Sequence, residues 1–349
     1  MQISHWLYQY PKLNISGQFK SSTEDFQVTE ILGYEPNGEG EHIYLWVRKT
    51  GLNTAYLAEQ IAKFTQLPLR AVTYAGRKDK HAQTEQWFSV HLPGKREFDW
   101  TQFNEPGAEV LKSIRHNKKL RTGVLKGNQF SITLRKLSSK PGIDERLQQI
   151  KKTGVPNYFG SQRFGNTLHD PRGGNLVLAD KMIYGETIRN RNKRSMAISA
   201  LRSWLFNEIL SSRLHNSYLN RPLTGDVMQL AGTNSFFCAE QIDINIRQRI
   251  EQRDIYLSAP LWGKGHLASQ SDALQFEQDF AQQHPAVTQT LEKLGLKQER
   301  RAINLFPNEL EWSWVDDTLN LGFSLPSGTF ATSVLRELID VQDNNLTHT

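Results

Sequence analysis

The alternation of apolar and polar side chains predicts a sheet in roughly the first 140 residues. Four segments carry it: Phe26–Leu32, His42–Lys49, the run TEQWFSVHL at 84–92, and Asn128–Arg135. A period of two residues places one set of side chains on a buried face of a strand. The connections between these segments are short, so we expect mostly antiparallel pairing.

Helical patterns interrupt and then follow these strands. One begins at Asn53–Thr54, where either residue can cap a helix, and ends near Pro68, which disfavours continuation. A second is expected over Ile143–Lys152 and is closed by Gly154. Helical and irregular segments dominate the middle of the chain, and Ser195–Leu214 has the clearest apolar stripe.

The C-terminal part of the chain returns to strands. The run at 310–328 alternates like a strand pair, and a short helix is expected over Ser333–Asp340. We therefore expect an α+β fold made of two domains. Residues 1–153 and 304–349 would form a discontinuous domain with a mixed, mostly antiparallel sheet, and residues 154–303 an inserted, largely helical domain.

Composition and charge narrow the class of protein. Apolar residues make up 38% of the 349 residues and charged residues 22%, which suits a soluble globular chain. The net charge of +6 and a pI near 9.2 favour a polyanionic partner such as nucleic acid. Cys238 is the single cysteine, which excludes an internal disulfide. Neither a signal peptide nor a membrane-spanning run is recognised, so we expect a cytoplasmic protein.

The familiar cofactor motifs are missing from the sequence. There is no GxxxxGK[ST], no strand-borne GxGxxG, no HExxH and no GxSxG. No feature of the sequence requires a nucleotide cofactor or a metal, so we expect none. The lack of a glycine-rich turn between strand and helix argues against an RNA methyltransferase.

Two basic runs contain no acidic residue. One lies between Val110 and Phe130, and the other between Thr187 and Arg202. Each could be a solvated face, or could contact the phosphates of a nucleic acid. Aromatic residues flank Arg163 in the sequence YFGSQRF, where they could stack on bases or fill a core. The cations of the two runs are Lys112, Arg115, Lys118, Lys119, Arg121 and Lys126, then Arg189, Arg191, Lys193, Arg194 and Arg202.

A single acid, Asp79, lies between Lys78 and Lys80 in a loop that follows the short strand-like run AVTYAG. The loop could be an ordinary charged surface loop. Alternatively, the flanking cations stabilise the ionised carboxylate, lower its pKa and keep it available as a base or nucleophile. They would also attract a phosphate backbone to the same place.

Five motifs resemble those of the tRNA pseudouridine synthase D (TruD) family in order and spacing: AGRKDKHAQTEQW, KGNQF, VPNYFGSQRFGN, RNRNKRS and LPSGTFATSVLRELI. The family often has another polar residue where Arg77 stands, a difference that we expect to be tolerated. The resemblance implies an isomerase that converts uridine to pseudouridine in RNA, chiefly at position 13 of tRNA, without cofactor or metal. It also implies a V-shaped pair of domains, one catalytic and one inserted.

The resemblance assigns roles to individual residues. Asp79 matches the catalytic aspartate, acting as nucleophile or as base toward the sugar. Phe130 matches the place where most other pseudouridine synthases carry a tyrosine, and Lys20 is the candidate basic partner of the aspartate. The residues that match the uridine pocket are Phe26, Asn128 and Phe330.

The resemblance also leads us to expect that the inserted domain holds the tRNA backbone through a set of cations. These are Arg163, Arg189, Arg191, Lys193 and Arg194. Two other readings of the same features are a non-catalytic RNA-binding protein and a pseudouridine synthase that acts on another RNA. We expect a monomer with no obligate protein partner and no membrane association.

Overall fold

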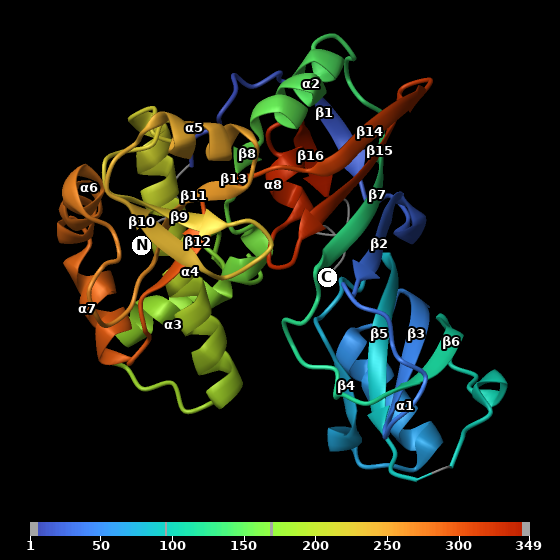
Figure 1. Ribbon diagram of the computed structural model, residues 1–349. Coiled ribbons are helices and arrows are strands. Elements are labelled where there is room, and N and C mark those ends of the chain that lie inside the picture. The colour runs from blue at the N-terminus through green and yellow to red at the C-terminus, as the bar shows by residue number, and fades with distance from the viewer. Residues whose placement is uncertain (1–5, 95, 168–169, 344–349) are drawn as a thin grey trace. The chain divides into compact units, whose positions relative to one another are not determined.

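The computed structural model describes residues 6–94, 96–167 and 170–343 (Figure 1). The chain forms two compact units. Unit 1 comprises the residues up to Lys12, Lys152–Phe306 and Thr332–Glu337, and unit 2 comprises Leu13–Lys151, Pro307–Ala331 and the residues from Leu338 on. The predicted assignment of residues 1–153 with 304–349 and of 154–303 to two functional domains stays a prediction.

Unit 2 is built on a 10-stranded sheet whose main order is β14-β15-β7-β2-β5-β3-β6. Two pairs are parallel, β2 with β5 and β1 with β16, and the others are antiparallel. The α+β prediction with a mixed, mostly antiparallel sheet is confirmed. The strands are β1 (Ser16–Phe19), β2 (Phe26–Ile31), β3 (His42–Thr50), β4 (Val72–Tyr74), β5 (Gln83–His91), β6 (Ala108–His116), β7 (Gly127–Arg135), β14 (Asn308–Val315), β15 (Thr318–Pro326) and β16 (Asp340–Asp343).

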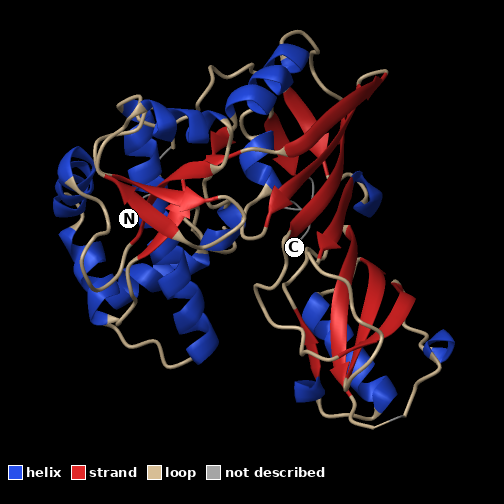
Figure 2. Cartoon of the chain, viewed as in Figure 1, coloured by secondary structure: helices blue, strands red, loops and turns tan. Residues whose placement is uncertain are grey.

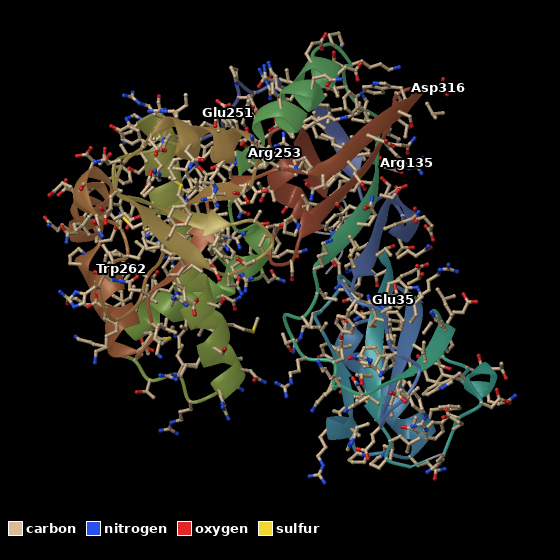
Figure 3. The ribbon with its side chains drawn as sticks, in the orientation of Figure 1. Glu35, Arg135, Glu251, Arg253, Trp262 and Asp316 are labelled. Atoms are coloured by element: carbon tan, nitrogen blue, oxygen red, sulfur yellow. The ribbon has the colours of Figure 1, made fainter. Side chains whose placement is uncertain are left out.

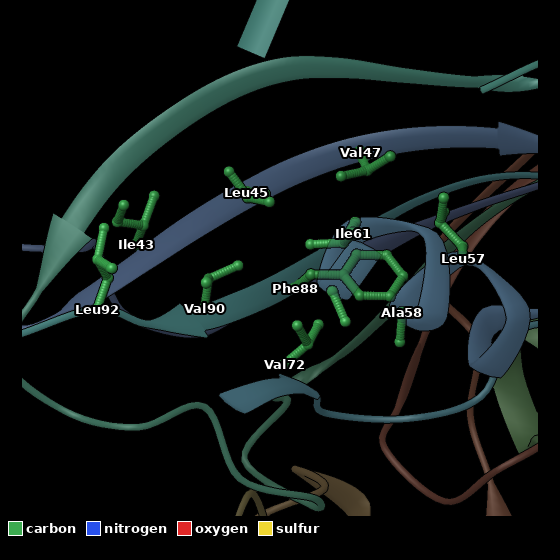
Figure 4. Close-up of a cluster of buried hydrophobic side chains, with 11 residues drawn as sticks. Ile43, Leu45, Val47, Leu57, Ala58, Ile61, Val72, Phe88, Val90 and Leu92 are labelled. Atoms are coloured by element: carbon green, nitrogen blue, oxygen red, sulfur yellow. The ribbon is translucent and has the colours of Figure 1, made fainter. Parts of the chain in front are cut away.

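Helix α1 (Thr54–Thr65) covers one face of the β3–β5 part of the sheet. Its Leu57 and Ile61 are fully buried against strand residues such as Leu45 and Phe88 (Figure 4). Burying each of these side chains contributes about 1.5–3 kcal/mol. A second apolar cluster includes Tyr44 and Trp87 from β3 and β5.

Shorter helical elements complete unit 2. They are η1 (Thr23–Asp25), η2 (Leu69–Ala71), η3 (Trp100–Gln102), most of α2 (Ile143–Thr153) and the first residue of α8 (Ala331–Leu335). Asp144 at the start of α2 accepts hydrogen bonds from the indole N–H groups of Trp312 and Trp314 in β14, at 2.7 and 3.0 Å. These bonds attach the helix to the first strand of the sheet.

Unit 1 combines helices with a sheet, as Figure 2 shows. The long helix α4 (Arg191–His215) packs against α3 (Gly174–Ile183), α7 (Pro285–Lys293) and β11 (Ile255–Leu261). Inside the unit, Arg213 and Asp226 form a fully buried bidentate ion pair with N–O distances of 2.8 and 2.7 Å. The other elements are β8 (Val155–Pro156), η4 (Ser161–Phe164), α3 (Gly174–Ile183), β9 (Asp226–Leu230), β10 (Phe236–Ala239), α5 (Ile244–Glu251), β11 (Ile255–Leu261), α6 (Ser271–Gln282), α7 (Pro285–Lys293), β12 (Glu299–Ala302) and β13 (Asn304–Leu305).

Two expectations about secondary structure were wrong. The helix expected over Ser333–Asp340 ends at Leu335 instead, and Asp340 begins strand β16, which pairs in parallel with Ser16. That pairing joins residues more than 300 positions apart, so no local pattern reports it. The middle of the chain also contains the four-stranded sheet β10-β9-β11-β12, where only helical and irregular segments were expected. Across the described residues, no helix is long and apolar enough to cross a membrane.

Candidate active site

The parallel pairing of β2 with β5 brings the loops of Lys20 and Asp79 together. Gln27 lies opposite Gln83, so both strands begin at the same edge of the sheet. Lys20 precedes β2 across the short turn η1, and Asp79 lies in the loop that enters β5. Since both loops precede strands that start side by side, two residues 59 positions apart meet at this edge.

The Lys20 ammonium and the Asp79 carboxylate form a direct ion pair. Their side chains are 5% and 19% exposed, so the pair is largely shielded from water while the carboxylate stays reachable. The second carboxylate oxygen, Oδ1, accepts the backbone N–H of His81 at 3.0 Å. Hydrogen bonds and an adjacent cation both stabilise a carboxylate in its ionised form.

Aromatic rings lie directly behind this ion pair. The Lys20 ammonium is 4.6 Å from the ring centroid of Phe26 and 5.1 Å from that of Phe19, within the range of a cation–π interaction. Phe26 in turn stacks on Phe130, with ring centroids 6.1 Å apart. The structure therefore brings together four of the six predicted site residues: Asp79, Lys20, Phe26 and Phe130.

Asn128 and Phe330 belong to the opposite end of β2. Asn128 pairs with Glu30, four residues along β2 from Phe26, which corresponds to about 13 Å at 3.3 Å per residue. Its other neighbour is Leu325 near the end of β15, and the half-buried Phe330 follows that strand by four residues. The Asn128 Oδ1 atom is buried and has no hydrogen-bond donor among the described residues.

A buried ion pair that sequence reasoning missed joins the loop of Asp79 to this opposite end. The Lys78 ammonium pairs with Glu30, whose side chain has no exposed surface. Burial raises the pKa of the Glu30 carboxyl, and the Lys78 charge partly offsets this effect. Glu30 also accepts the backbone N–H of Trp87 at 2.8 Å. Of the two lysines that flank Asp79, Lys78 is therefore paired with Glu30, and Lys80 is exposed.

Two further residues hold the loop from the side of α1. Lys49 is fully buried and donates to the main-chain oxygens of Asp79 and Leu52, at 2.8 and 2.9 Å. Burial lowers the pKa of Lys49 to about 8, although the Asp79 charge opposes the shift. Thr54 accepts the backbone N–H of Lys78 at 2.9 Å, so its hydroxyl serves the loop rather than the helix end.

A weak signal for Lys49 exists in the sequence. Positions 43, 45 and 47 of the strand carry apolar side chains that face the core, and Lys49 continues the same alternation. A lysine at an inward position needs a buried partner, and the sequence does not say which one.

The predicted backbone contacts lie in unit 1. Arg189, Arg191, Lys193 and Arg194 are all exposed and lie just before or within the first turn of α4, which Asn190 caps by accepting the N–H of Lys193. Arg163 in η4 differs, because its guanidinium donates to Ser199 at 3.0 Å and packs over Phe159 at 5.3 Å. Burial lowers the pKa of Arg163. Within the described ranges, no group of three or more His, Cys, Asp or Glu residues could hold a metal ion.

Comparison with known proteins gives a consistent result. The family model for tRNA pseudouridine synthase D (TruD) matches residues 2–182 and 186–338. The tRNA pseudouridine synthase D of Pseudoalteromonas atlantica is 62% identical, with 98% of each chain covered, and that of Hydrogenovibrio crunogenus is 44% identical, again with 98% of each covered. A crystal structure from Methanosarcina mazei that bears the same name aligns with a TM-score of 0.72 at 21% identity, over 97% of this chain and 96% of the other, and so supports the fold.

The fold and the family match define an RNA-modifying isomerase of the pseudouridine synthase class. More specifically, the chain belongs to the TruD family of tRNA pseudouridine synthases.

Proposed function

We propose that this enzyme isomerises uridine 13 of tRNA and that Asp79 is its catalytic residue. The observation that supports this most is the Lys20–Asp79 ion pair at the shared edge of β2 and β5. It combines a partly exposed carboxylate, a buried counter-charge and buried aromatic rings in one place.

The reaction rearranges one glycosidic bond. The bond between uracil N1 and ribose C1′ breaks, the free base turns and a bond forms from C5 to C1′. The C5 hydrogen leaves as a proton and N1 takes up a proton, so the product is an isomer of uridine. Asp79 can start this sequence as a nucleophile at C1′ or as a base at C2′. Both routes begin with the ionised carboxylate, which Lys20 and the N–H of His81 stabilise.

Contacts in the pocket must also offset the removal of the base from its stack, which costs a few kcal/mol. We assign stacking on the base to Phe26 or Phe330, at about 1–3 kcal/mol for a stacked base, and place Phe130 behind Phe26, on which its ring stacks. Asn128 Oδ1 would accept the N3–H of uracil, which supplies the donor that this buried acceptor lacks among the described residues.

We assign the tRNA backbone to the exposed cations Arg189, Arg191, Lys193 and Arg194, assisted by Arg163. Four exposed cations around a helix N-terminus add to the positive end of the helix dipole, so an anion there lowers their mutual repulsion. We further propose that the protein acts in the cytoplasm as a monomer without an obligate partner. Sedimentation of the purified protein at micromolar concentration tests the monomer.

Tritium release from tRNA labelled at uridine C5 tests the reaction and the role of Asp79 together. Unmodified transcripts carry either uridine or cytidine at position 13, and the enzyme is wild type or Asp79→Asn. We expect release only from the wild type with uridine 13. Release by Asp79→Asn would remove Asp79 from the chemistry, whereas release from the cytidine 13 transcript would move the target to another uridine.

A deuterium label at ribose C2′ separates the two routes open to Asp79. Removal of that hydrogen by a base gives a primary isotope effect on single turnover. Attack at C1′ breaks no bond to that hydrogen and gives at most a small secondary isotope effect.

A further inference from the structure

The connection between β6 and β7, residues 117–126, crosses the sheet. β6 is the last strand on one side of the order, and β3, β5 and β2 separate it from β7. Four strand-to-strand steps of about 4.8 Å amount to about 19 Å, a distance that the ten residues span with a turn over 121–124, where the N–H of Val124 donates to the oxygen of Arg121. Figure 1 shows it passing over the strands of the sheet. We call residues 117–126 the basic strap.

Apolar side chains and main-chain bonds hold the strap in place. Leu120 and Leu125 are buried in the cluster around Tyr44 and Trp87. The Tyr44 hydroxyl donates to the main-chain oxygen of Lys118 at 3.0 Å. None of these contacts uses a charged side chain.

The far end of the strap is bonded to the elements of the proposed active site. The N–H of Gly123 donates to the oxygen of Ala75, which begins the loop of Asp79, at 3.2 Å. Lys126 bonds through its backbone to Ile31 at the end of β2 and to Ser327, three residues before Phe330, at 2.9 and 3.1 Å. Main-chain hydrogen bonds therefore join the strap to the loop of Asp79, to β2 and to the segment that carries Phe330.

The charged side chains of the strap point to a partner outside the chain. Lys118, Lys119, Arg121 and Lys126 are exposed, and among the described residues none has a carboxylate within 4.0 Å. The strap itself contains no acid. Three arginines of the same unit are instead paired with acids: Arg48 with Glu85 and Glu109, Arg115 with Glu97, and Arg135 (labelled in Figure 3) with Asp25.

The positive charge of the strap lowers the pKa of two nearby histidines. Burial lowers the pKa of His42, and the charges of His91 and Lys119 lower it further. Burial and the Lys118 charge act on the pKa of His116 in the same direction. Four like charges in ten residues repel one another, and phosphate groups would relieve that repulsion.

We propose that the basic strap is a second RNA-binding surface, which contacts phosphates of the tRNA and lies outside the cation set of unit 1. This inference rests on the proposed active site being in unit 2. A strap that is held by buried leucines and main-chain hydrogen bonds and that carries several exposed cations suits contacts to a nucleic-acid backbone. Bound RNA would thereby be fixed to the same main chain that positions Asp79.

The test compares two variants that each remove four positive charges from unit 2. One replaces Lys118, Lys119, Arg121 and Lys126 by Gln. The control replaces Lys63, Arg70, Lys136 and Lys140 by Gln, which are likewise exposed. The affinity for unmodified tRNA is measured from 50 to 300 mM salt in the Asp79→Asn background, so that turnover does not interfere. Thermal midpoints verify folding, and the pairs 118/119 and 121/126 replace the quadruple variant if it fails to fold.

We expect the strap variant to bind tRNA about tenfold or more weakly and to lose about 3 from the slope of log affinity against log salt, while the control keeps most of both. Equal losses in the two variants would reduce the effect to net charge and overturn the proposal. So would unchanged tRNA affinity together with lost binding to phosphatidylglycerol vesicles, which would assign the strap to a membrane surface. The strap variant could lose tRNA binding while the wild type releases no tritium in the assay described above. That combination would support the strap as an RNA-binding surface and reject the proposed reaction.

Discussion

The buried ammonium of Lys49 donates to the main-chain oxygen of Asp79 at 2.8 Å. Both described acceptors of Lys49 are carbonyl groups, so this cation neutralises no carboxylate by direct contact and instead fixes two turns of the backbone. We therefore regard Lys49 as a positioning residue. It sets where the carboxylate of Asp79 lies while Lys20 sets its electrostatic environment.

The pH dependence of stability reports on Lys49. Its pKa is about 8 in the folded chain and 10.5 ordinarily, so between these values the unfolded chain binds more protons. The contribution of Lys49 to the free energy of unfolding therefore increases as the pH rises from about 8 to about 10.5. The free energy of unfolding in urea is measured at pH 7.5 and at pH 9.5. Between these two values it should increase less, or decrease more, for Lys49→Met than for the wild type. An identical pH response in both would contradict the lowered pKa, and Lys63→Met is the exposed control.

Replacing Lys20 by Ala should lower kcat far more than replacing Lys80 by Ala. Lys20 touches the Asp79 carboxylate, whereas Lys80 is an exposed neighbour in sequence. A hydrogen bond to a charged group is worth about 1.5–3 kcal/mol, which corresponds to a rate loss of roughly 10- to 150-fold for Lys20→Ala. Single-turnover rates at saturating tRNA give the comparison. Similar losses in the two variants would mean that local charge, and not the specific pair, governs the rate.

Asn128→Ala should separate binding from folding. The Oδ1 atom of Asn128 is a buried acceptor without a donor in the described part of the chain, so its removal costs little or no stability. We expect an unchanged thermal midpoint and a loss of about 1–3 kcal/mol in kcat/KM, which is the cost of leaving uracil N3–H unpaired. A large fall in the midpoint would assign Asn128 to the fold instead.

The buried Arg213–Asp226 pair should be much more sensitive to single than to double substitution. Arg213→Met leaves the Asp226 carboxylate buried without its partner, at a cost of about 3–5 kcal/mol. The double variant Arg213→Met with Asp226→Leu removes both charges and should recover most of that loss. Denaturant unfolding of the three proteins measures the coupling. Additive losses would show that the two side chains do not act as a pair.

The cations at the start of α4 should determine part of the salt dependence of tRNA binding. Substituting Arg189, Arg191, Lys193 and Arg194 by Ala removes up to four phosphate contacts and should lower the slope of log affinity against log salt by about 3. Filter binding across a salt series measures it. If the slope did not change, these residues would be a solvated surface.

Local patterns in the sequence were enough for the elements that bury one regular face. Strands β2, β3, β5 and β7 and helix α1 lie within a few residues of the predicted segments, because alternation and helical spacing are local properties. Strand β16 was missed because its pairing with Ser16 is set by the far end of the chain.

The residues of the candidate site also fall into those that could be predicted from the sequence and those that could not. Resemblance to a family supplied Asp79 and Lys20, and the structure brings them into contact. The partners of the loop, Lys49 and Glu30, could not be read from the sequence. Each is a charged residue in a strand that finds its partner only when β2, β3 and β5 lie side by side, and the identity of that partner is a tertiary property.

The order of synthesis imposes a delay on the sheet of unit 2. β7 ends at Arg135, and β15, which fills its open edge, is complete only at Pro326. At 5–20 residues per second, a ribosome needs roughly 10–40 seconds to deliver the intervening chain. For that time a nascent β7 presents unpaired main-chain groups to its surroundings, and such an edge can recruit strands from other chains. The insertion thus makes β7 a point at which a chaperone, or slow translation, would decide the yield of active enzyme.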